Sequence, residues 1–426
     1  MTPIAIRRHP IELLPQSERV ILRPFFPADT QHVAAILARI QALGEEEADG
    51  VLEGVLSDFG TRHRDLESVL LTHYDRASPH LQTEAPLSGS RRLLIGAMFS
   101  GEFSIESAAL FNPSIVAHPD QSDAPDGGVR FIMSLRSVGE GHISSIEFRA
   151  GTIDAHGEIT LDPTSGYVGA AQIVPNARYK RRKVVYAIDF PSTSPIDERV
   201  IFPVTANESN GIEDARFVRF VDRDGSVVYY ATYTAYNGRT ISPQLIETRD
   251  FLHFRVLTLG GTAVHNKGMA LFPRRIAGRY AMLSRQDDEN ILIMFSDDPH
   301  SWSDAEVVVR PAAFWESTKI GNCGSPVETE AGWLVITHGV GAMRTYHIGA
   351  VLLDLDDPTR VIGRLEHPLI SPEGPGREGY VPNVVYSCGS LLHGRNLILP
   401  YAMSDRVTTI VTVSLDDLLV ALAGPA

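Results

Sequence analysis

Short apolar and β-branched runs recur along this 426-residue chain from about residue 91 to its end, and Gly, Pro, Asp and Asn separate them. Because each run is short and bounded by turn residues, the pattern predicts strands. The expected strands are 129–135, 142–148, 183–190, 215–221, 227–236, 280–283, 291–295, 333–338, 348–353, 397–403 and 408–413. Many short strands with few helices are typical of a β-sandwich, a barrel or a propeller.

Local signals refine this all-β interpretation. The turn Asp222–Gly225 separates two apolar-aromatic runs, which predicts a hairpin. The sequence segments 296–299 and 355–358 resemble each other, and the distance between them along the chain is close to the length of one four-stranded propeller blade. The region after residue 90 has room for about five such blades. Residues 415–422 are expected to form a short helix.

The first 90 residues carry a different pattern. Apolar residues spaced for one helix face occur at 33–40, 51–59 and 66–73, and Asp29 or Thr30 provides an N-cap for the first stripe. These narrow stripes with charged opposite faces indicate helices that lie on a larger body or in a subunit interface. We therefore expect a helical extension at 1–90, which could support a homo-oligomer, and a β catalytic domain at 91–426.

Charge and cysteine content exclude several classes of function. Lys and Arg number 38 and Asp and Glu 52, for a formal charge of −14, which opposes binding to nucleic acid or anionic lipid. The two cysteines, Cys323 and Cys388, are far apart, and no CxxC pair or metal-ligand spacing of histidines occurs. No phosphate-binding glycine loop, signal peptide or long apolar run is present. The expectation is a cytoplasmic protein without metal, cofactor, nucleic-acid or membrane partner.

Two adjacent carboxylates mark the strongest candidate for acid–base chemistry. Glu213 and Asp214 precede Arg216 at the start of an apolar strand. Neighbouring side chains of a strand point to opposite faces, so one carboxylate is expected in a cavity and the other against a neighbour such as Arg216. A partly desolvated carboxylic acid can act as a general acid. The alternative interpretation is a loop carboxylate that caps a turn.

Four basic residues lie beside or at the ends of apolar runs: Lys267, Arg285, Lys319 and His338. Each alone is compatible with a salt bridge or with an apolar stem whose charged end reaches water. If the four converge, they form an anion pocket in an otherwise acidic protein.

Tyrosines on the 227–236 strand are a third candidate group. Strand alternation places Tyr230 and Tyr236 on one face and Tyr229 and Tyr233 on the other. Tyrosine can stack on a sugar ring and bind its hydroxyls, so Tyr236 is a candidate substrate residue. Tyrosines packed in the core are the alternative.

Several phrases together resemble glycoside hydrolase family 130, the β-mannoside phosphorylases and related β-mannosidases. They lie in the order and spacing of that family over about 95–415, at 111–113, 211–216, 232–236, 271–285, 319–321, 332–340 and 381–385. The resemblance implies a five-bladed β-propeller with a central active site. The chain departs from the family at Ala215, where proline is usual, and at 144–147, where the family carries an arginine.

The resemblance also assigns roles to individual residues. It implies that Asp214 is the proton donor, acting through a mannose hydroxyl, and that phosphate binds at Lys267, Arg285, Lys319 and His338. It places sugar-binding residues at Asn112, Arg136 and Asp405, to which we add their neighbours Glu213, Arg216 and Tyr236.

Phosphorolysis with inversion is the expected reaction. Phosphate is already a nucleophilic anion, so a phosphorylase needs an acid and fixed cations, whereas an inverting hydrolase needs a second carboxylate to activate water. The expected substrates are a β-mannoside, with β-1,2-linked oligomannosides favoured, and inorganic phosphate, which yield α-mannose 1-phosphate. The alternatives are a β-mannosyltransferase that uses mannose 1-phosphate or a nucleotide sugar, a β-1,2-mannosidase, and a non-enzymatic carbohydrate-binding scaffold.

Overall fold

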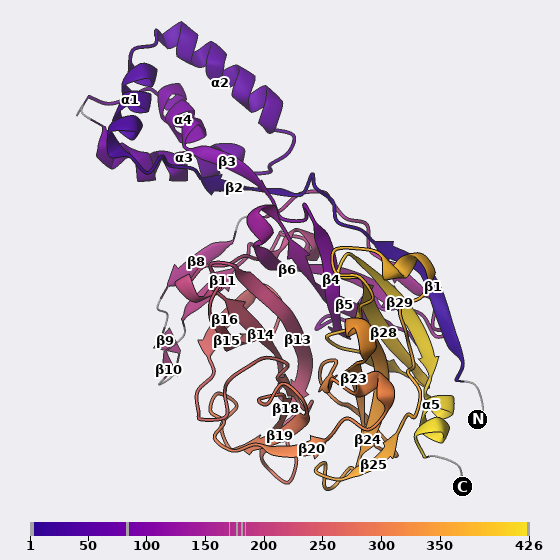
Figure 1. The fold of residues 1–426 in the computed structure, drawn as a ribbon. Helices are drawn as coiled ribbons and strands as arrows, with labels where there is room; N and C mark the ends of the chain where they lie inside the picture. Colours follow the sequence, from indigo (N-terminus) through magenta and orange to yellow (C-terminus); the bar gives the residue numbers. More distant parts are fainter. Residues whose placement is uncertain are drawn as a thin grey trace. The chain divides into compact units, whose positions relative to one another are not determined.

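The computed structural model describes residues 4–81, 85–169, 171–175, 178–179, 182–183 and 185–423 (Figure 1). It is mostly β with few helices. The chain divides into a β unit, made of Met1–Gln16, Glu106–Thr164 and Ala171–Ala426, and a helical unit, made of Ser17–Ile105 with Ser165–Ala170. Among the described residues, no helix has the length and apolar character needed to cross a bilayer.

The division between the units differs from the boundary at residue 90 that the sequence predicts. Strand β1 (Ile6–Leu13) pairs with β29 (Val407–Ser414), so the first residues belong to the β unit. Strand β2 (Val20–Pro24) pairs with β3 (Ser100–Ser104), so the helical unit continues to residue 105. Strand pairings between segments distant in sequence set the boundaries of the two units, and hydrophobic periodicity does not reveal such pairings.

The helical unit contains α1 (Thr30–Gln41), α2 (Glu45–Phe59), α3 (Leu66–Ala77), the 3₁₀ turn η1 (Ser78–His80) and α4 (Gly89–Met98). The first three match the expected helices. The Asp29 side chain accepts a hydrogen bond from the Gln31 backbone N–H, which confirms Asp29 as the N-cap of α1. Buried Val33, Leu37 and Leu94 contribute to the core of this unit.

The largest sheet of the β unit contains β4 (Ala109–Ala117), β5 (Val129–Val138), β6 (Ser144–Ile153), β13 (Gly211–Val221), β14 (Val227–Tyr236), β15 (Ile241–Thr248), β16 (His253–Thr258), β11 (Tyr186–Asp189) and β8 (Gln172–Pro175), in this order, with β7 (Ile159–Leu161) and β12 (Val200–Ile201) also paired to β6. One parallel pair, Gly211 with Ser144, links β6 to β13 in the described chain. The sheet therefore consists of two antiparallel groups joined at one point, and Figure 1 shows β13 beside β14.

Smaller antiparallel sheets complete the β unit. They are β17 (Ala270–Leu271), β18 (Tyr280–Ser284), β19 (Ile291–Ser296) and β20 (Glu306–Val309); β21 (Lys319–Asn322), β23 (Gly332–Val340), β24 (Tyr346–Leu353) and β25 (Val361–Arg364), with β22 (Val327–Thr329) on β23; β1, β29, β28 (Asn396–Met403) and β26 (Val385–Tyr386), with β27 (Leu391–His393) on β28; and the pair β9 (Arg178–Tyr179) and β10 (Arg182–Lys183). Helix α5 (Leu415–Leu422) follows β29, as expected.

Short 3₁₀ turns connect several strands of the β unit: η2 (Glu140–His142), η3 (Ile196–Glu198), η4 (Ala206–Glu208), η5 (Phe314–Glu316), η6 (Ala342–Arg344) and η7 (Gly374–Arg377). Each expected strand overlaps an observed one, although some bounds differ; β13, for example, begins at Gly211 and not at residue 215. The 142–148 strand begins at Ser144, because Gly141 and His142 adopt positive φ in a turn. The 183–190 strand is β11, and residue 184 lies outside the described chain.

The expected hairpin at Asp222–Gly225 is present. Asp222 N–H donates to the Ser226 carbonyl at 2.9 Å, and Gly225 has φ +79°. This left-handed conformation costs little for glycine, which explains its place in the turn.

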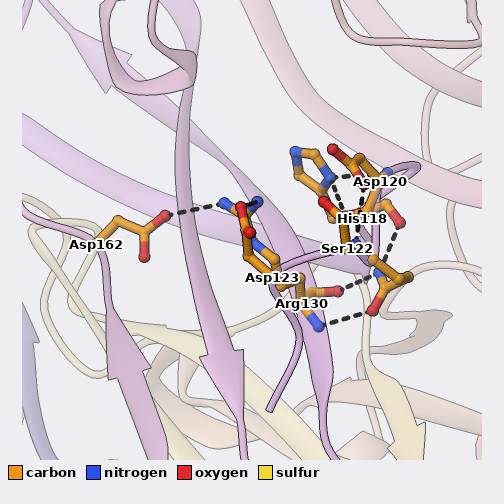
Figure 2. Close-up of polar contacts among 7 residues, drawn as sticks. His118, Asp120, Ser122, Asp123, Arg130 and Asp162 are labelled. Carbon is orange, nitrogen blue, oxygen red and sulfur yellow. Dashed lines mark hydrogen bonds and ion pairs between the residues drawn. The ribbon is translucent and has the colours of Figure 1, made fainter.

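Polar contacts within the β4–β5 connection, and from it to neighbouring residues, fix this segment (Figure 2). The Asp120 carboxylate accepts from the Ser122 N–H at 2.9 Å, and the Arg130 guanidinium pairs with Asp123 and with Asp162, each at 3.4 Å. This connection follows the last residue of β4, whereas Asn112 lies near the middle of the strand.

Candidate active site

Two β-bulges bring the acid candidate and a sugar-binding candidate together. In β4, Asn112 and Pro113 lie opposite a single residue of β5, and Asn112 has φ +50°. In β13, Asp214 and Ala215 lie opposite Tyr233 alone, and Asp214 has φ +54°. The Asn112 Nδ2 donates to Asp214 Oδ1 at 2.7 Å. Bulges re-aim side chains, so here the backbone departs from regular pairing where it places these two groups.

Arg136, on β5, holds both carboxylates of the Glu213–Asp214 pair. Its Nη2 donates to Glu213 Oε1 at 2.8 Å and its Nη1 to Asp214 Oδ1 at 3.3 Å. The prediction that the two carboxylates would face opposite sides is therefore wrong. The bulge at Asp214 breaks the strand alternation on which that prediction depended.

Opposing effects act on the Asp214 carboxyl. Burial raises its pKa, but Arg136, Lys267, the Asn112 hydrogen bond and Arg216 together outweigh burial, and the pKa lies below its usual value. The ligand-free site therefore holds Asp214 as a carboxylate.

Two of the four predicted phosphate-binding residues meet directly, and a third is joined to them through a shared carboxylate. Arg285, which follows β18, donates from Nη1 to Nε2 of His338 on β23 at 2.8 Å. Lys319, at the start of β21, binds Asp288, whose carboxylate also lies 3.5 Å from Arg285 Nε. Gly321 permits this proximity, because a Cβ there would lie 2.4 Å from His338 Cε1 and 3.0 Å from Arg285 Nη1. The cations thus converge, as an anion pocket requires.

His338 is neutral in this arrangement. A guanidinium can only donate, so Nε2 of His338 accepts and the proton is on Nδ1. That Nδ1 faces the Cys323 thiol, with 3.8 Å between nitrogen and sulfur. Burial first, and then the charges of Arg285 and other cations, hold the pKa of His338 well below its ordinary value. His338 thus orients Arg285 and adds no positive charge of its own.

Lys267 joins the cluster from the loop before β17. The neighbouring Asn266 side chain donates to the Arg285 carbonyl at 2.8 Å, which ties this loop to the residue after β18. The charge of Lys267 acts on Asp214, on His338 and on Asp405, lowering the pKa of each. The four predicted positions therefore lie near one another.

Arg216 does not hold Glu213 or Asp214, contrary to expectation. Its guanidinium crosses to two other strands, donating to the Asn322 carbonyl at 2.7 Å and to the Tyr386 hydroxyl at 2.6 Å. Burial raises the pKa of the Tyr386 phenol, so its hydroxyl stays neutral at physiological pH. Sequence reasoning missed Tyr386 and Asn322. Asn322 lies on β21 with Lys319, and Tyr386 lies on β26, but nothing in their sequence spacing indicates that Arg216 contacts them.

Asp405 lies in the turn between β28 and β29, with φ +50°. Burial and the charge of Asp214 raise its pKa to about 6, against the opposing charges of Arg136, Arg344 and Lys267. Two carboxylates near Arg136 therefore have pKa values shifted in opposite directions, an arrangement typical of acid–base sites. Arg344 is a further charged group that sequence reasoning did not find.

The tyrosines of β14 separate into core and site positions. Tyr229 and Tyr233 are buried in the hydrophobic core, and the Tyr233 hydroxyl donates to Glu208. Tyr230 belongs to the core cluster on the other side of the strand. The core interpretation therefore holds for these three. Tyr236 is only partly buried and pairs with Gly211, at the end of β13 that carries Glu213 and Asp214.

The buried donors and acceptors fit a polar ligand that both accepts and donates hydrogen bonds. Buried polar atoms without a hydrogen-bond partner in the described chain include Asn112 Oδ1, Arg136 Nε, Arg285 Nε and Asn322 Oδ1. Such atoms are costly unless a ligand or water satisfies them. No cluster of three or more His, Cys, Asp or Glu side chains suited to a metal occurs in the described parts of the chain.

A family model described as beta-1,4-mannooligosaccharide phosphorylase matches residues 191–423, so this chain belongs to glycoside hydrolase family 130. A 1,2-beta-oligomannan phosphorylase of Thermoanaerobacter sp. (strain X514) is 34% identical over 257 residues, which is 58% of this chain and 85% of the relative. A beta-1,2-mannobiose phosphorylase of Listeria innocua is 31% identical over 221 residues, 49% of this chain and 60% of the relative.

Solved structures share the fold. A beta-1,2-mannobiose phosphorylase from Listeria innocua, in complex with beta-1,2-mannobiose, has a TM-score of 0.53 at 20% identity and covers 75% of this chain and 93% of its own. A glycosyl hydrolase from Bacteroides ovatus has a TM-score of 0.52 at 17% identity and covers 73% and 85%. The family resemblance stated from the sequence is thereby confirmed.

Proposed function

We propose that this chain is an inverting β-mannoside phosphorylase that uses a β-1,2-linked oligomannoside and inorganic phosphate. The observation that carries the proposal is that Arg285 and Lys319 share the Asp288 carboxylate, while the charge of Lys267 acts both on Asp214 and on His338, the partner of Arg285. Two relatives named above as phosphorylases of β-1,2-linked mannosides support the choice of linkage.

We further propose that the β unit is a five-bladed β-propeller with this site at its centre. The proposed site residues come from segments spread over the β unit: β4, β5, β13, β14, the loop before β17, the residue after β18, β21, β23 and the turn between β28 and β29. Contacts already connect several of these segments, since Asn112 on β4 binds Asp214 on β13, and Arg216 on β13 reaches both β21 and β26. Segments that surround a common axis account for these contacts.

In the proposed reaction, a phosphate oxygen attacks C1 of the β-mannosyl residue from the face opposite the leaving oxygen. The bond between C1 and the glycosidic oxygen breaks, and that oxygen receives the proton of Asp214, relayed through a mannose hydroxyl. The products are α-mannose 1-phosphate and the shortened oligomannoside. Asn112, Arg136, Glu213, Arg216, Tyr236 and Asp405 make up the proposed sugar-binding set.

The state of Asp214 suggests how the two substrates act together. In the ligand-free site, cations keep the pKa of Asp214 low, which would leave no proton to donate. A phosphate bound among Lys267, Arg285 and Lys319 brings negative charge that offsets them, and it therefore raises the pKa of Asp214. Phosphate thus both supplies the nucleophile and promotes protonation of the acid.

The test is incubation of the purified chain with β-1,2-mannobiose, with and without phosphate, and measurement of mannose 1-phosphate. We expect phosphate-dependent product, and a 10²- to 10⁴-fold lower rate in Asp214→Asn. The exposed Asp297→Asn is the matched control, because it makes the same chemical change at a side chain that is 91% exposed. Phosphate-independent release of mannose would indicate a mannosidase. Sugar binding without turnover, unaffected by Asp214→Asn, would indicate a scaffold.

A further inference from the structure

The cluster of cations contains a carboxylate that the reaction does not use. Asp288 lies in the turn between β18 and β19 and adopts φ +58°. Its two oxygens are 3.2 and 3.1 Å from Lys319 Nζ, and Oδ1 is 3.5 Å from Arg285 Nε. One carboxylate therefore faces two of the proposed phosphate-binding cations.

The adjacent Asp287 shows that Asp288 is not needed to build this turn. Asp287 accepts hydrogen bonds from the backbone N–H groups of Glu289 and Asn290, at 3.0 and 2.9 Å, and from the Asn290 side chain at 2.7 Å. Asp287 thus stabilises the turn. Within the described chain, the Asp288 side chain instead contacts Lys319 and Arg285.

Exposure and unsatisfied polar groups indicate that the contact is replaceable. The Asp288 side chain is 55% exposed, so it can rotate into water, while Arg285 is 5% exposed. Nε of Arg285 is buried and forms no hydrogen bond within the described residues. A phosphate oxygen can approach Arg285 Nε and Lys319 Nζ more closely than the Asp288 carboxylate does. Charge-assisted hydrogen bonds are stronger when they are shorter.

We propose that Asp288 sets the affinity of the site for phosphate: in the free enzyme its carboxylate takes the place of a phosphate oxygen on Lys319 and Arg285, and phosphate binds by displacing it. This inference depends on the proposed function of the site. It makes Asp288 a competitor of the substrate and distinguishes it from the residues that bind phosphate.

The structure also gives the size of the effect. Partly exposed ion pairs are weak, and phosphate must break this contact before it binds. Removal of the carboxylate charge should therefore tighten phosphate binding about two- to fivefold. If Asp288 instead positions Lys319 and Arg285 for phosphate, its removal should weaken binding.

The experiment compares wild type with Asp288→Asn by titrating inorganic phosphate in a calorimeter and by measuring the phosphate KM of turnover. Glu289→Gln is the matched control, because it removes the same charge from the same turn at an exposed side chain. We expect a two- to fivefold lower Kd and KM for phosphate in Asp288→Asn, and smaller changes in Glu289→Gln and in the KM for mannoside.

The outcomes separate this inference from the proposed function. A wild-type enzyme that turns over with phosphate, together with an Asp288→Asn variant whose phosphate Kd is unchanged or higher, overturns the role of Asp288 alone. Equal tightening in Glu289→Gln also overturns it, because a general charge effect would then explain the result. A wild-type chain that neither binds phosphate nor depends on it for turnover contradicts the proposed function itself.

Discussion

Replacement of Asp405 by asparagine should stabilise the β unit at neutral pH, even though Asp405 belongs to the proposed site. Burial and the nearby Asp214 raise the pKa of Asp405 from 3.8 to about 6. Because the native pKa exceeds the unfolded one, the native state holds this proton more tightly. The native state is therefore favoured below about pH 4, and that advantage is lost as the pH rises through 6.

The structure gives the magnitude. Moving a carboxyl pKa from 3.8 to about 6 corresponds to about 3 kcal/mol of unfolding free energy above pH 6.5. Residual solvent contact at this partly buried side chain lowers the figure, so we expect a gain of about 1–3 kcal/mol for Asp405→Asn at pH 7.5. At pH 4, where the native carboxyl is protonated, variant and wild type should be nearly equal.

Tryptophan fluorescence reports on the relevant unit, because Trp302, Trp315 and Trp333 all lie in the β unit. Urea unfolding at pH 4 and pH 7.5 then measures the difference. Asp297→Asn serves as the control and should change stability by less than about 0.5 kcal/mol at either pH. A variant that is destabilised at pH 7.5, or stabilised equally at both pH values, would refute the argument.

Two further predictions concern close packing at Gly321 and the hydrogen bonds of the buried Arg91. Gly321→Ala should raise the phosphate KM by about tenfold or more in steady-state kinetics, because the new Cβ would displace His338. Gly54→Ala is the control and should leave the KM unchanged, because a Cβ at Gly54 would have no atom within 4 Å. Arg91→Met should destabilise the helical unit by about 2–4 kcal/mol, because it removes the hydrogen-bond donors of the carbonyls of residues 40, 41 and 43. Unfolding followed by circular dichroism measures the change, and Arg92→Met, at an exposed side chain, is the control and should not destabilise the unit.

Local patterns in the sequence predict most elements of the fold. The helical stripes correspond to α1, α2 and α3, and the 227–236 run is β14 at its full length. These elements follow from periodicity because each has one buried face. The pairing of β1 with β29 joins residues about 400 positions apart, so no local pattern indicates it. The unit boundaries depend on that pairing and on β2–β3, and they were accordingly missed.

The sequence likewise predicted some residues of the candidate site but not the contacts between them. Residue type and position beside apolar runs identified Lys267, Arg285, Lys319 and His338 as cations, but their convergence depends on tertiary contacts. The neutral state of His338 also depends on neighbours from other strands. Asp288 was missed because an aspartate in a polar turn is ordinary in sequence, and its ion pairs become visible only in three dimensions.

Backbone strain links the errors in prediction to the chemistry of the site. Asn112, Asp214, Asp288 and Asp405 each have a positive φ, although none is glycine. A regular strand alternates its side chains, so it could not direct both Glu213 and Asp214 toward Arg136. Bulges and left-handed turns do so at a cost of about 1–3 kcal/mol per residue, which the surrounding structure must offset. Strand periodicity therefore fails as a guide at Asn112 and Asp214, the two candidate positions that lie within strands.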